Sequence, residues 1–263
     1  MNYTKFNKEI VVVTGAGQGI GKEIAKNLHE KYDLLLISKT SNCKKTSEQI
    51  KKNVLKSINT NRIIEYLKID LEKKFTVSKL ENKINFEKYE KIHLILCAGV
   101  VDQYKDGYKK IINWEKVFNI NLFSNINLIN SFLKFYGKNK KQNKIIAFSG
   151  GGAASSFKAF PIYSASKTAL VRTVENYSEI LSKKNVSIFA IAPGAVKTKM
   201  LKKVEKITKV GTRSEIFDVV KFVNQCLNMN TNIFNGKLIH IKDNISKISK
   251  NKSRDYLKLR RTQ

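Results

Sequence analysis

The chain has 263 residues, is 42% hydrophobic and carries a formal net charge of +29. This size suits one α/β domain with a full core, and the lack of any run of eighteen apolar residues argues against a membrane span. The charge does not predict a nucleic-acid partner, because the 44 Lys are scattered along the chain and only 6 Arg occur, whereas nucleic-acid surfaces cluster Arg among aromatic residues.

Short apolar runs, many of them β-branched, alternate with segments in which apolar residues recur every three or four positions. The first pattern predicts buried parallel strands and the second predicts amphipathic helices. In chain order we predict strand 10–13, helix 20–31, strand 34–37, helix 46–57, strand 63–69, strand 92–96, helix 114–136, strand 144–148, helix 161–182, strand 186–191, helix 214–228 and strand 237–241. Such alternation predicts a doubly wound parallel α/β sheet with helices on both faces.

No linker or repeat divides the chain, so we predict a single domain over residues 1–243 and a basic tail over residues 244–263. The first nine residues are polar and lead into a strand, so we expect no signal peptide. The three cysteines, Cys43, Cys97 and Cys226, have no close pair spacing, which fits free thiols in a reducing compartment. We therefore expect a cytoplasmic protein without a metal site.

Residues 14–21 read Thr-Gly-Ala-Gly-Gln-Gly-Ile-Gly and lie between the first predicted strand and helix. Gly15, Gly19 and Gly21 would let backbone amides, and the helix N-terminus at Ile20, approach a pyrophosphate. A glycine-rich turn without a ligand is the alternative. Because strand, loop and helix follow in the required order, we predict a dinucleotide cradle here.

Residues 163–167 read Tyr-Ser-Ala-Ser-Lys inside a predicted helix. The four-residue spacing places Tyr163 and Lys167 on one helix face. A phenol has a pKa of about 10, and a neighbouring ammonium group favours the phenolate. The pair can pass a proton to or from a carbonyl oxygen, so we predict Tyr163 as a general acid/base and expect Lys167 to lower its pKa.

These two motifs, with Asp70, Cys97-Ala98-Gly99, Asn121 and Pro193-Gly194 in family order, resemble the short-chain dehydrogenase/reductase family over residues 10–243. The resemblance implies a Rossmann-like sheet of about seven strands in the order 3-2-1-4-5-6-7. It also implies hydride transfer between a nicotinamide cofactor and a small-molecule carbonyl or secondary alcohol. Family members pair through the helices that here hold Asn121 and Tyr163, which implies a homodimer or homotetramer.

The resemblance assigns further residues to the cofactor and the proton path. It implies that Lys167 hydrogen-bonds the nicotinamide ribose, that Asn121 holds a relay water, and that Asp70 meets the adenine amino group. The remaining implied cofactor contacts are Ala98, Gly99, Pro193, Gly194 and Thr198. The position of Asn121 has local competitors, since other asparagines crowd the same stretch at residues 119, 125, 127 and 130.

The end of the second strand should select the cofactor, because an acid there would bind the adenosine ribose 2′-hydroxyl. Residues 34–45 contain no carboxylate, whereas Ser38 can donate a hydrogen bond and Lys39 can pair with a 2′-phosphate. We therefore favour NADP(H) over NAD(H). The alternative is that Lys39 is simply one more Lys in a Lys-rich chain.

Two positions depart from the family pattern. Gly150 stands where the catalytic Ser is expected, thirteen residues before Tyr163, and Cys97 stands where the family usually has Asn. Ser149 is one residue early, so on a strand it would face the opposite side unless the glycine run 150–152 reshapes the backbone. We keep Ser149 as the candidate catalytic hydroxyl, with residues 155 and 156 as other serine donors.

Two functions from different classes follow. The first is an NADP(H)-dependent carbonyl reductase or alcohol dehydrogenase acting on a 3-oxoacyl thioester or a sugar intermediate. The second is a dinucleotide-binding module whose chemistry has weakened and which serves regulation or assembly; Gly150 is its single argument. In either case we expect residues 153–160 and 199–213 to form the lid of the pocket.

Overall fold

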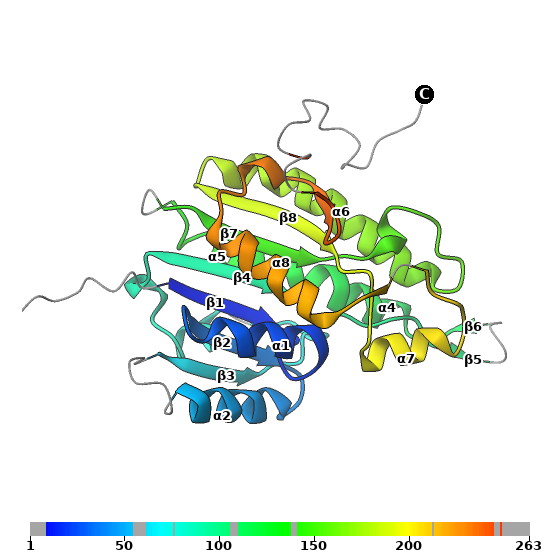
Figure 1. Cartoon of the computed structure of the whole chain (residues 1–263), viewed down its shortest axis with the longest axis horizontal. Coiled ribbons are helices and arrows are strands. Elements are labelled where there is room, and N and C mark those ends of the chain that lie inside the picture. Colours follow the sequence, from blue (N-terminus) through cyan, green and yellow to red (C-terminus); the bar gives the residue numbers. More distant parts are fainter. Residues whose placement is uncertain are drawn as a thin grey trace, which may run out of the picture.

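The computed structural model describes residues 9–54, 62–75, 77–105, 110–137, 141–211, 213–244 and 248. Its centre is a seven-stranded sheet whose neighbouring strands all pair in parallel (Figure 1). The strands are β1 (Glu9–Thr14), β2 (Asp33–Ser38), β3 (Ile64–Lys68), β4 (Lys91–Leu96), β7 (Asn143–Phe148), β8 (Val186–Ala192) and β11 (Leu238–His240). Their order across the sheet is β11-β8-β7-β4-β1-β2-β3, which confirms the predicted topology.

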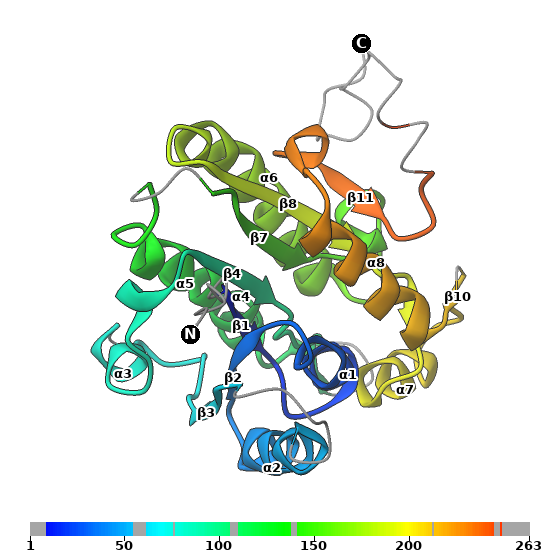
Figure 2. The same ribbon diagram turned by 60° about the vertical axis from the view of Figure 1, so that its left-hand side comes forward.

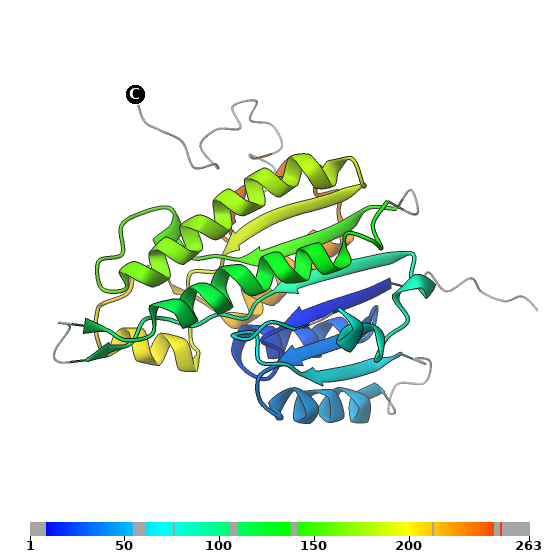
Figure 3. The same cartoon turned by 180° about the vertical axis from the view of Figure 1, so that it is seen from behind.

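Helices cover both faces of the sheet (Figure 2). One face carries α1 (Gly19–Leu28), α2 (Asn42–Val54) and α8 (Ile216–Asn228). The other, which is turned to the viewer in Figure 3, carries α4 (Trp114–Phe118), a π-helical turn (Asn119–Phe123), α5 (Ser124–Phe132) and α6 (Pro161–Ser182). A short helix α3 (Ser78–Glu81) and three 3-10 turns (Phe86–Lys88, Gly151–Ala153, Asn232–Phe234) complete the connections.

The core has one apolar cluster on each face of the sheet, as the alternation of strand side chains requires. Along β1, Ile10 and Val12 belong to the cluster under α5 and α6, whereas Val11 and Val13 belong to the cluster under α1 and α8. All four are at most 1% exposed. Burial on both faces is why the strands read as continuous apolar runs rather than as alternating ones.

Several short elements gather beyond the carboxyl ends of the parallel strands, at the right of Figure 1. They are the hairpin of β5 (Tyr104–Lys105) and β6 (Lys110–Ile111), the pair β9 (Ala195–Val196) and β10 (Arg213–Ser214), and helix α7 (Lys199–Glu205). This is the edge of an open α/β sheet at which ligands bind.

Most predicted elements are present with shifted ends, and α6 has the predicted bounds. The predicted helix 114–136 is interrupted by the π turn, and α2 begins four residues before its predicted start. Helix α7 was not predicted, because only Leu201 and Val204 in it are buried and most of its other residues are Lys. Its start is fixed locally, by the Thr198 hydroxyl that accepts a hydrogen bond from the Leu201 N–H at 3.2 Å.

Within the described residues, no helix combines the length and the apolar character that crossing a membrane requires. The predicted basic tail 244–263 lies outside the described residues except for Asn244 and Ile248.

Candidate active site

The glycine loop after β1 makes a tight turn into α1. Gly15 and Gly19 have φ angles of +69° and +56°, in the left-handed region that favours glycine. A Cβ on Gly15 would lie 3.1 Å from the Cα of Ala98, and a Cβ on Gly21 would lie 2.7 Å from the Gly15 carbonyl oxygen. Side chains at these two positions would collide with neighbouring backbone atoms, so glycine is what allows the turn to pack closely between β1 and α1.

The loop is tied to the ends of two other strands. The Thr14 hydroxyl accepts a hydrogen bond from the Ala98 N–H at 3.1 Å, which joins the ends of β1 and β4. A Cβ on Gly19 would lie 3.3 Å from the Thr198 methyl group. Thr198 follows the turn after β8, in which Gly194 has a φ of +73°. The structure therefore brings the predicted contacts from three strand ends to one edge.

A cluster of three charged residues lies at the end of β2. Lys39 and Asp70 in it were predicted as site residues, and Glu72 was not. The Lys39 ammonium group lies 2.9 Å from Asp70 and 3.4 Å from Glu72, and the hydrogen bond to Asp70 raises the pKa of Lys39. Ser38 is nearly buried and donates a hydrogen bond to the Thr40 carbonyl at 2.8 Å. The segment after β3 thus supplies the carboxylates that the end of β2 lacks. Asp70 and Glu72 both pair with Lys39, the residue predicted to bind a 2′-phosphate.

Helix α6 presents Tyr163 and Lys167 on one face, as predicted. Lys167 is 3% exposed, and its ammonium group donates a hydrogen bond to the Phe148 carbonyl at 2.7 Å. The same nitrogen lies 5.8 Å from the centre of the Tyr163 ring. The carboxyl end of β7 therefore fixes the Lys, while Tyr163 packs against the apolar cluster around Val101 and Phe160.

The expected lowering of the Tyr163 pKa is wrong for this structure. Burial raises the pKa of Tyr163 to about 12 and lowers the pKa of Lys167 to about 8. The Lys167 ammonium group is directed at the Phe148 carbonyl. Desolvation, which disfavours the phenolate, therefore outweighs the attraction of the ammonium group for that phenolate. Tyr163 is consequently a neutral phenol at neutral pH, the form that donates a proton.

Asn121 lies fully buried in the π-helical turn between α4 and α5. Its Oδ1 accepts a hydrogen bond from the Val100 N–H, and its Nδ2 donates one to the Val100 carbonyl, both at 2.9 Å. Nδ2 also lies 3.0 Å from the Ser166 hydroxyl on α6. Single π turns inside α-helices are frequent at functional sites, and this one links the segment after β4 to the helix of Tyr163.

Gly99 marks the point at which these groups converge. A Cβ placed on it would lie 3.4 Å from the Asn121 Oδ1 and 3.5 Å from the Lys167 Nζ. The neighbouring Cys97 thiol is inert, because burial raises its pKa to about 12. The segment after β4 therefore touches the glycine loop through Ala98 and the α6 face through Gly99.

The contact expected of a catalytic Ser falls on Gly150 and not on Ser149. A Cβ on Gly150 would lie 2.9 Å from the Tyr163 hydroxyl oxygen. The Ser149 hydroxyl is enclosed, and no hydrogen-bond partner for it occurs among the described residues. Ser155 and Ser156 are exposed, and the Ser155 hydroxyl donates to the Gly151 carbonyl. The structure thus brings no Ser hydroxyl into contact with the phenol among the residues described.

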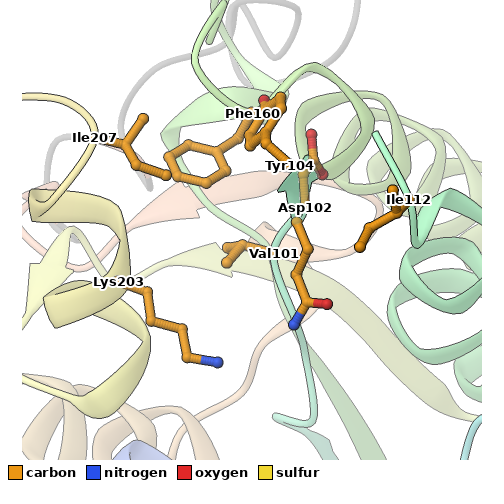
Figure 4. Close-up of a pocket in the computed structure, with 8 residues that line it drawn as sticks. Val101, Asp102, Tyr104, Ile112, Phe160, Lys203 and Ile207 are labelled. Atoms are coloured by element: carbon orange, nitrogen blue, oxygen red, sulfur yellow. The ribbon is translucent and has the colours of Figure 1, made fainter. Parts of the chain in front are cut away.

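A cavity of about 490 Å³ opens beside this site. Figure 4 shows Lys203 and Ile207 on one side of it and Ile112 on the opposite side. Its other lining residues are Val101, Asp102, Gln103, Tyr104 and Phe160. The predicted lid segments contribute Phe160, Lys203 and Ile207. The segment after β4 was missed, since its only sequence signal was an Asp three residues beyond Gly99.

In the described part of the chain, no group of three or more His, Cys, Asp or Glu residues could hold a metal ion. The titratable groups of the site are the phenol, the ammonium groups of Lys167 and Lys39, and the carboxylates described above.

Comparison with known proteins places these features in a family. The family model described as short chain dehydrogenase matches residues 9–209. A 3-oxoacyl-[acyl-carrier-protein] reductase of Buchnera aphidicola is 26% identical over 259 residues, covering 90% of this chain and 97% of its own length. A short chain dehydrogenase of Shigella flexneri, solved with NADP, superposes with a TM-score of 0.76 at 17% identity, covering 90% of this chain and 98% of that one.

A second solved structure, 4-hydroxyisoleucine dehydrogenase with NADH, superposes with a TM-score of 0.67 at 19% identity and covers 89% of this chain and 96% of its own. These likenesses show the fold, and the family model spans most of the described chain, including the glycine loop, Asn121, Tyr163 and Lys167. The chain belongs to the short-chain dehydrogenase family.

Proposed function

We propose that the chain is an NADP(H)-dependent oxidoreductase that transfers a hydride between the nicotinamide and a carbonyl or secondary alcohol, with Tyr163 as general acid/base. The observation that carries this proposal is the close spacing of successive groups from the glycine loop through Ala98 and Gly99 to Lys167 and Tyr163. A dinucleotide seated on the loop would extend along these residues toward the phenol.

The cofactor would be held by the glycine loop at its pyrophosphate and by Ser38 and Lys39 at the adenosine ribose. Lys39 supports NADP(H), because an exposed ammonium group offers charge to a 2′-phosphate. The Shigella flexneri structure holds NADP, whereas the 4-hydroxyisoleucine dehydrogenase structure holds NADH. We therefore propose NADP(H) on the residues of this chain, with Asp70 and Glu72 as competitors for the same ammonium group.

The bound nicotinamide would supply or accept the hydride, and this chain's residues would handle the proton. In the reductive direction, Tyr163 donates its phenolic proton to the carbonyl oxygen as the hydride reaches the carbonyl carbon. Lys167 would hold the nicotinamide ribose through its ammonium group. Asn121 is proposed to hold the relay water that returns a proton to Tyr163.

The substrate proposed first is a 3-oxoacyl thioester. The Buchnera aphidicola relative is named as a reductase of such a thioester on an acyl carrier protein. The cavity here has apolar walls at Val101, Ile112, Phe160 and Ile207, which suit an acyl chain, and Lys203 of α7 lines it. The same helix also carries Lys199 and Lys202. These positive charges would attract an acidic carrier.

The alternative is a dinucleotide-binding module with weakened chemistry, favoured by Gly150 and by the enclosed Ser149 hydroxyl. Loss of a hydroxyl donor to a developing oxyanion typically costs about a hundredfold in rate. Ser149 remains a predicted donor that would require its hydroxyl to turn toward the substrate. The two functions differ in turnover and not in binding.

The deciding experiment measures NADPH oxidation with a panel of ketones and 3-oxoacyl thioesters. We expect turnover by the wild-type protein and a loss of at least about a hundredfold in Y163F, because the proton donor is removed. The matched control is Y66F, which removes a phenol from β3 far from α6 and should retain full activity. Cofactor binding without turnover on any substrate would favour the module.

We also propose that copies pair through α4, the π-helical turn that follows it, α5 and α6. Large apolar side chains on these segments are half-exposed, namely Trp114, Phe123 and Ile180. Burying them against a second copy would remove apolar surface from water. Light scattering of the purified protein should give twice or four times the mass of the chain, and a monomer at micromolar concentration would contradict the proposal.

A further inference from the structure

Helix α6 begins without a cap of its own. The residue before its first turn, Phe160, offers no side-chain acceptor. The first N–H groups of a helix have no partner within the helix, so they need one from elsewhere. Here they are satisfied by Asp102, which lies 60 residues earlier in the chain.

The Asp102 carboxylate is 3% exposed and uses both of its oxygens on this helix. Oδ2 accepts a hydrogen bond from the Ile162 N–H at 3.0 Å, and Oδ1 accepts one from the Tyr163 N–H at 2.7 Å. The second donor is the backbone of the proposed acid itself. A carboxylate at a helix N-terminus also meets the positive end of the helix dipole.

The segment that carries Asp102 is itself held at two points. The side chain of Asn121 engages both the N–H and the carbonyl of Val100, two residues earlier. Two residues later, the Tyr104 hydroxyl donates a hydrogen bond to the Ala159 carbonyl, two residues before α6 begins. The position of the Asp102 carboxylate is therefore fixed, and its hydrogen bonds determine the position of the first turn of α6.

We propose that Asp102 is a positioning residue for Tyr163: its carboxylate anchors the backbone of Tyr163 and thereby holds the phenol in line for proton transfer. This inference rests on the proposed function of Tyr163. A misplacement of about 1 Å in a reacting group can cost about a hundredfold in rate, so the anchor matters more for turnover than for cofactor binding.

The cavity gives this anchor a second consequence. Val101 and Asp102 line the cavity, as Figure 4 shows, so a substrate seated there would touch the same segment that holds Tyr163. Burial raises the pKa of the Asp102 carboxyl, whereas the two N–H groups oppose that shift. The buried Asp102 carboxylate keeps its charge because hydrogen bonds from the helix N-terminus replace the hydration that it loses.

The test uses D102N, which retains one acceptor oxygen, and D102A, which retains none. We expect kcat for carbonyl reduction to fall about tenfold in D102N and about a hundredfold in D102A. The dissociation constant of NADPH should stay within about twofold of the wild-type value, since the glycine loop is not touched. The graded loss in kcat at constant cofactor affinity distinguishes positioning from a general loss of structure.

The matched control is D33N. Asp33 is another nearly buried carboxylate that accepts a backbone N–H, from Ile63 at 3.1 Å, but it lies at the opposite end of the sheet. D33N should lower the melting temperature and leave kcat unchanged. If D102A does not fold, D102N carries the test. Unchanged kcat in a folded D102 variant would overturn the proposal.

Amide hydrogen exchange separates failure of this inference from failure of the proposed function. In D102N the amides of Ile162 and Tyr163 should exchange at least about tenfold faster, and those of α8 should not change. If the wild-type protein reduces no carbonyl but these amides respond, the proposed function fails and the anchor stands. If the amides do not respond, the anchor is overturned whatever the activity.

Discussion

The backbone of Gly150 lies directly against the hydroxyl of Tyr163, so that a Cβ at position 150 would stand 2.9 Å from the phenolic oxygen. Cβ atoms in proteins essentially never approach this closely, so the phenol occupies space that a side chain would need. Gly150 has a φ of −177°, an extended conformation that any residue adopts. Glycine is therefore required at position 150 by the contact with Tyr163 and not by the backbone conformation.

The first prediction is that G150A lowers kcat by about ten- to a hundredfold, because the added methyl group displaces the phenol from the substrate. NADPH affinity should be unchanged. Gly151 supplies the control, since a Cβ there meets nothing within 4 Å and G151A should retain wild-type kcat. Steady-state kinetics on both variants checks this, and equal activity of G150A and G151A would contradict it.

A comparison of G150S with G150A isolates the hydroxyl group. The two variants displace the phenol alike, so a higher rate for G150S would show that a hydroxyl at this position assists the reaction. Equal rates would show that this protein does not use one there.

The second prediction concerns pH. Burial lowers the pKa of Lys167 to about 8 in the cofactor-free protein. Its charged form, present below that pH, is the one that holds the ribose, so kcat/KM for NADPH should be highest below pH 8 and fall above it. K167R keeps its charge at all these pH values and should remove the decline near pH 8, although at a lower absolute rate. A wild-type profile that rises above pH 8 would sink this assignment.

The third prediction concerns cofactor choice. Removing the ammonium group in K39A should weaken NADPH binding about tenfold and leave NADH binding unchanged, since only the former has a 2′-phosphate. E72Q removes one competitor at 3.4 Å and should strengthen NADPH binding. K44A is the control, because Lys44 pairs with Glu48 at 3.9 Å on the exposed side of α2. Titration by nucleotide fluorescence measures all three, and equal losses for both nucleotides would refute the role of Lys39.

The elements and motifs that sequence reasoning identified are those whose signals are local. The strands of the sheet are short apolar runs, and the spacing of Tyr163 and Lys167 follows from one helix turn. The pKa of Tyr163 was predicted in the wrong direction because spacing does not reveal burial or the carbonyl of Phe148 that captures Lys167.

The contacts that were missed join segments far apart in the chain. Asp102 reaches α6 across 60 residues, and Glu72 joins Lys39 across 33. Neither residue belongs to a pattern along the chain, so only the packing of the parallel strands brings them to the site. Gly150 was recognised as a departure, yet its contact with the phenol depends on how the end of β7 meets α6.

The fourth prediction concerns acid stability at the opposite end of the sheet. Glu9 lies 2.6 Å from the Lys91 ammonium group and 3.5 Å from the His93 Nε2. Burial alone would raise the pKa of Glu9, but its contacts with His93 and Lys91 lower that pKa from 4.5 to about 2. A lowered folded-state pKa stabilises the fold above pH 4.5, and this contribution is lost as the pH falls from 4.5 toward 2.

A shift of this size corresponds to about 3 kcal/mol of unfolding free energy between pH 7 and pH 2. E9Q should therefore be less stable than the wild-type protein at pH 7 and should lose less stability on acidification. E48Q removes an acid from the exposed ion pair with Lys44 and should change unfolding free energy by less than about 1 kcal/mol. Urea denaturation at pH 7, 4.5 and 3 measures these differences. If the unfolding free energies of E9Q and the wild-type protein change with pH in the same way, Glu9 is not the group that titrates. Removing the titrating group would change the number of protons that the protein takes up on unfolding.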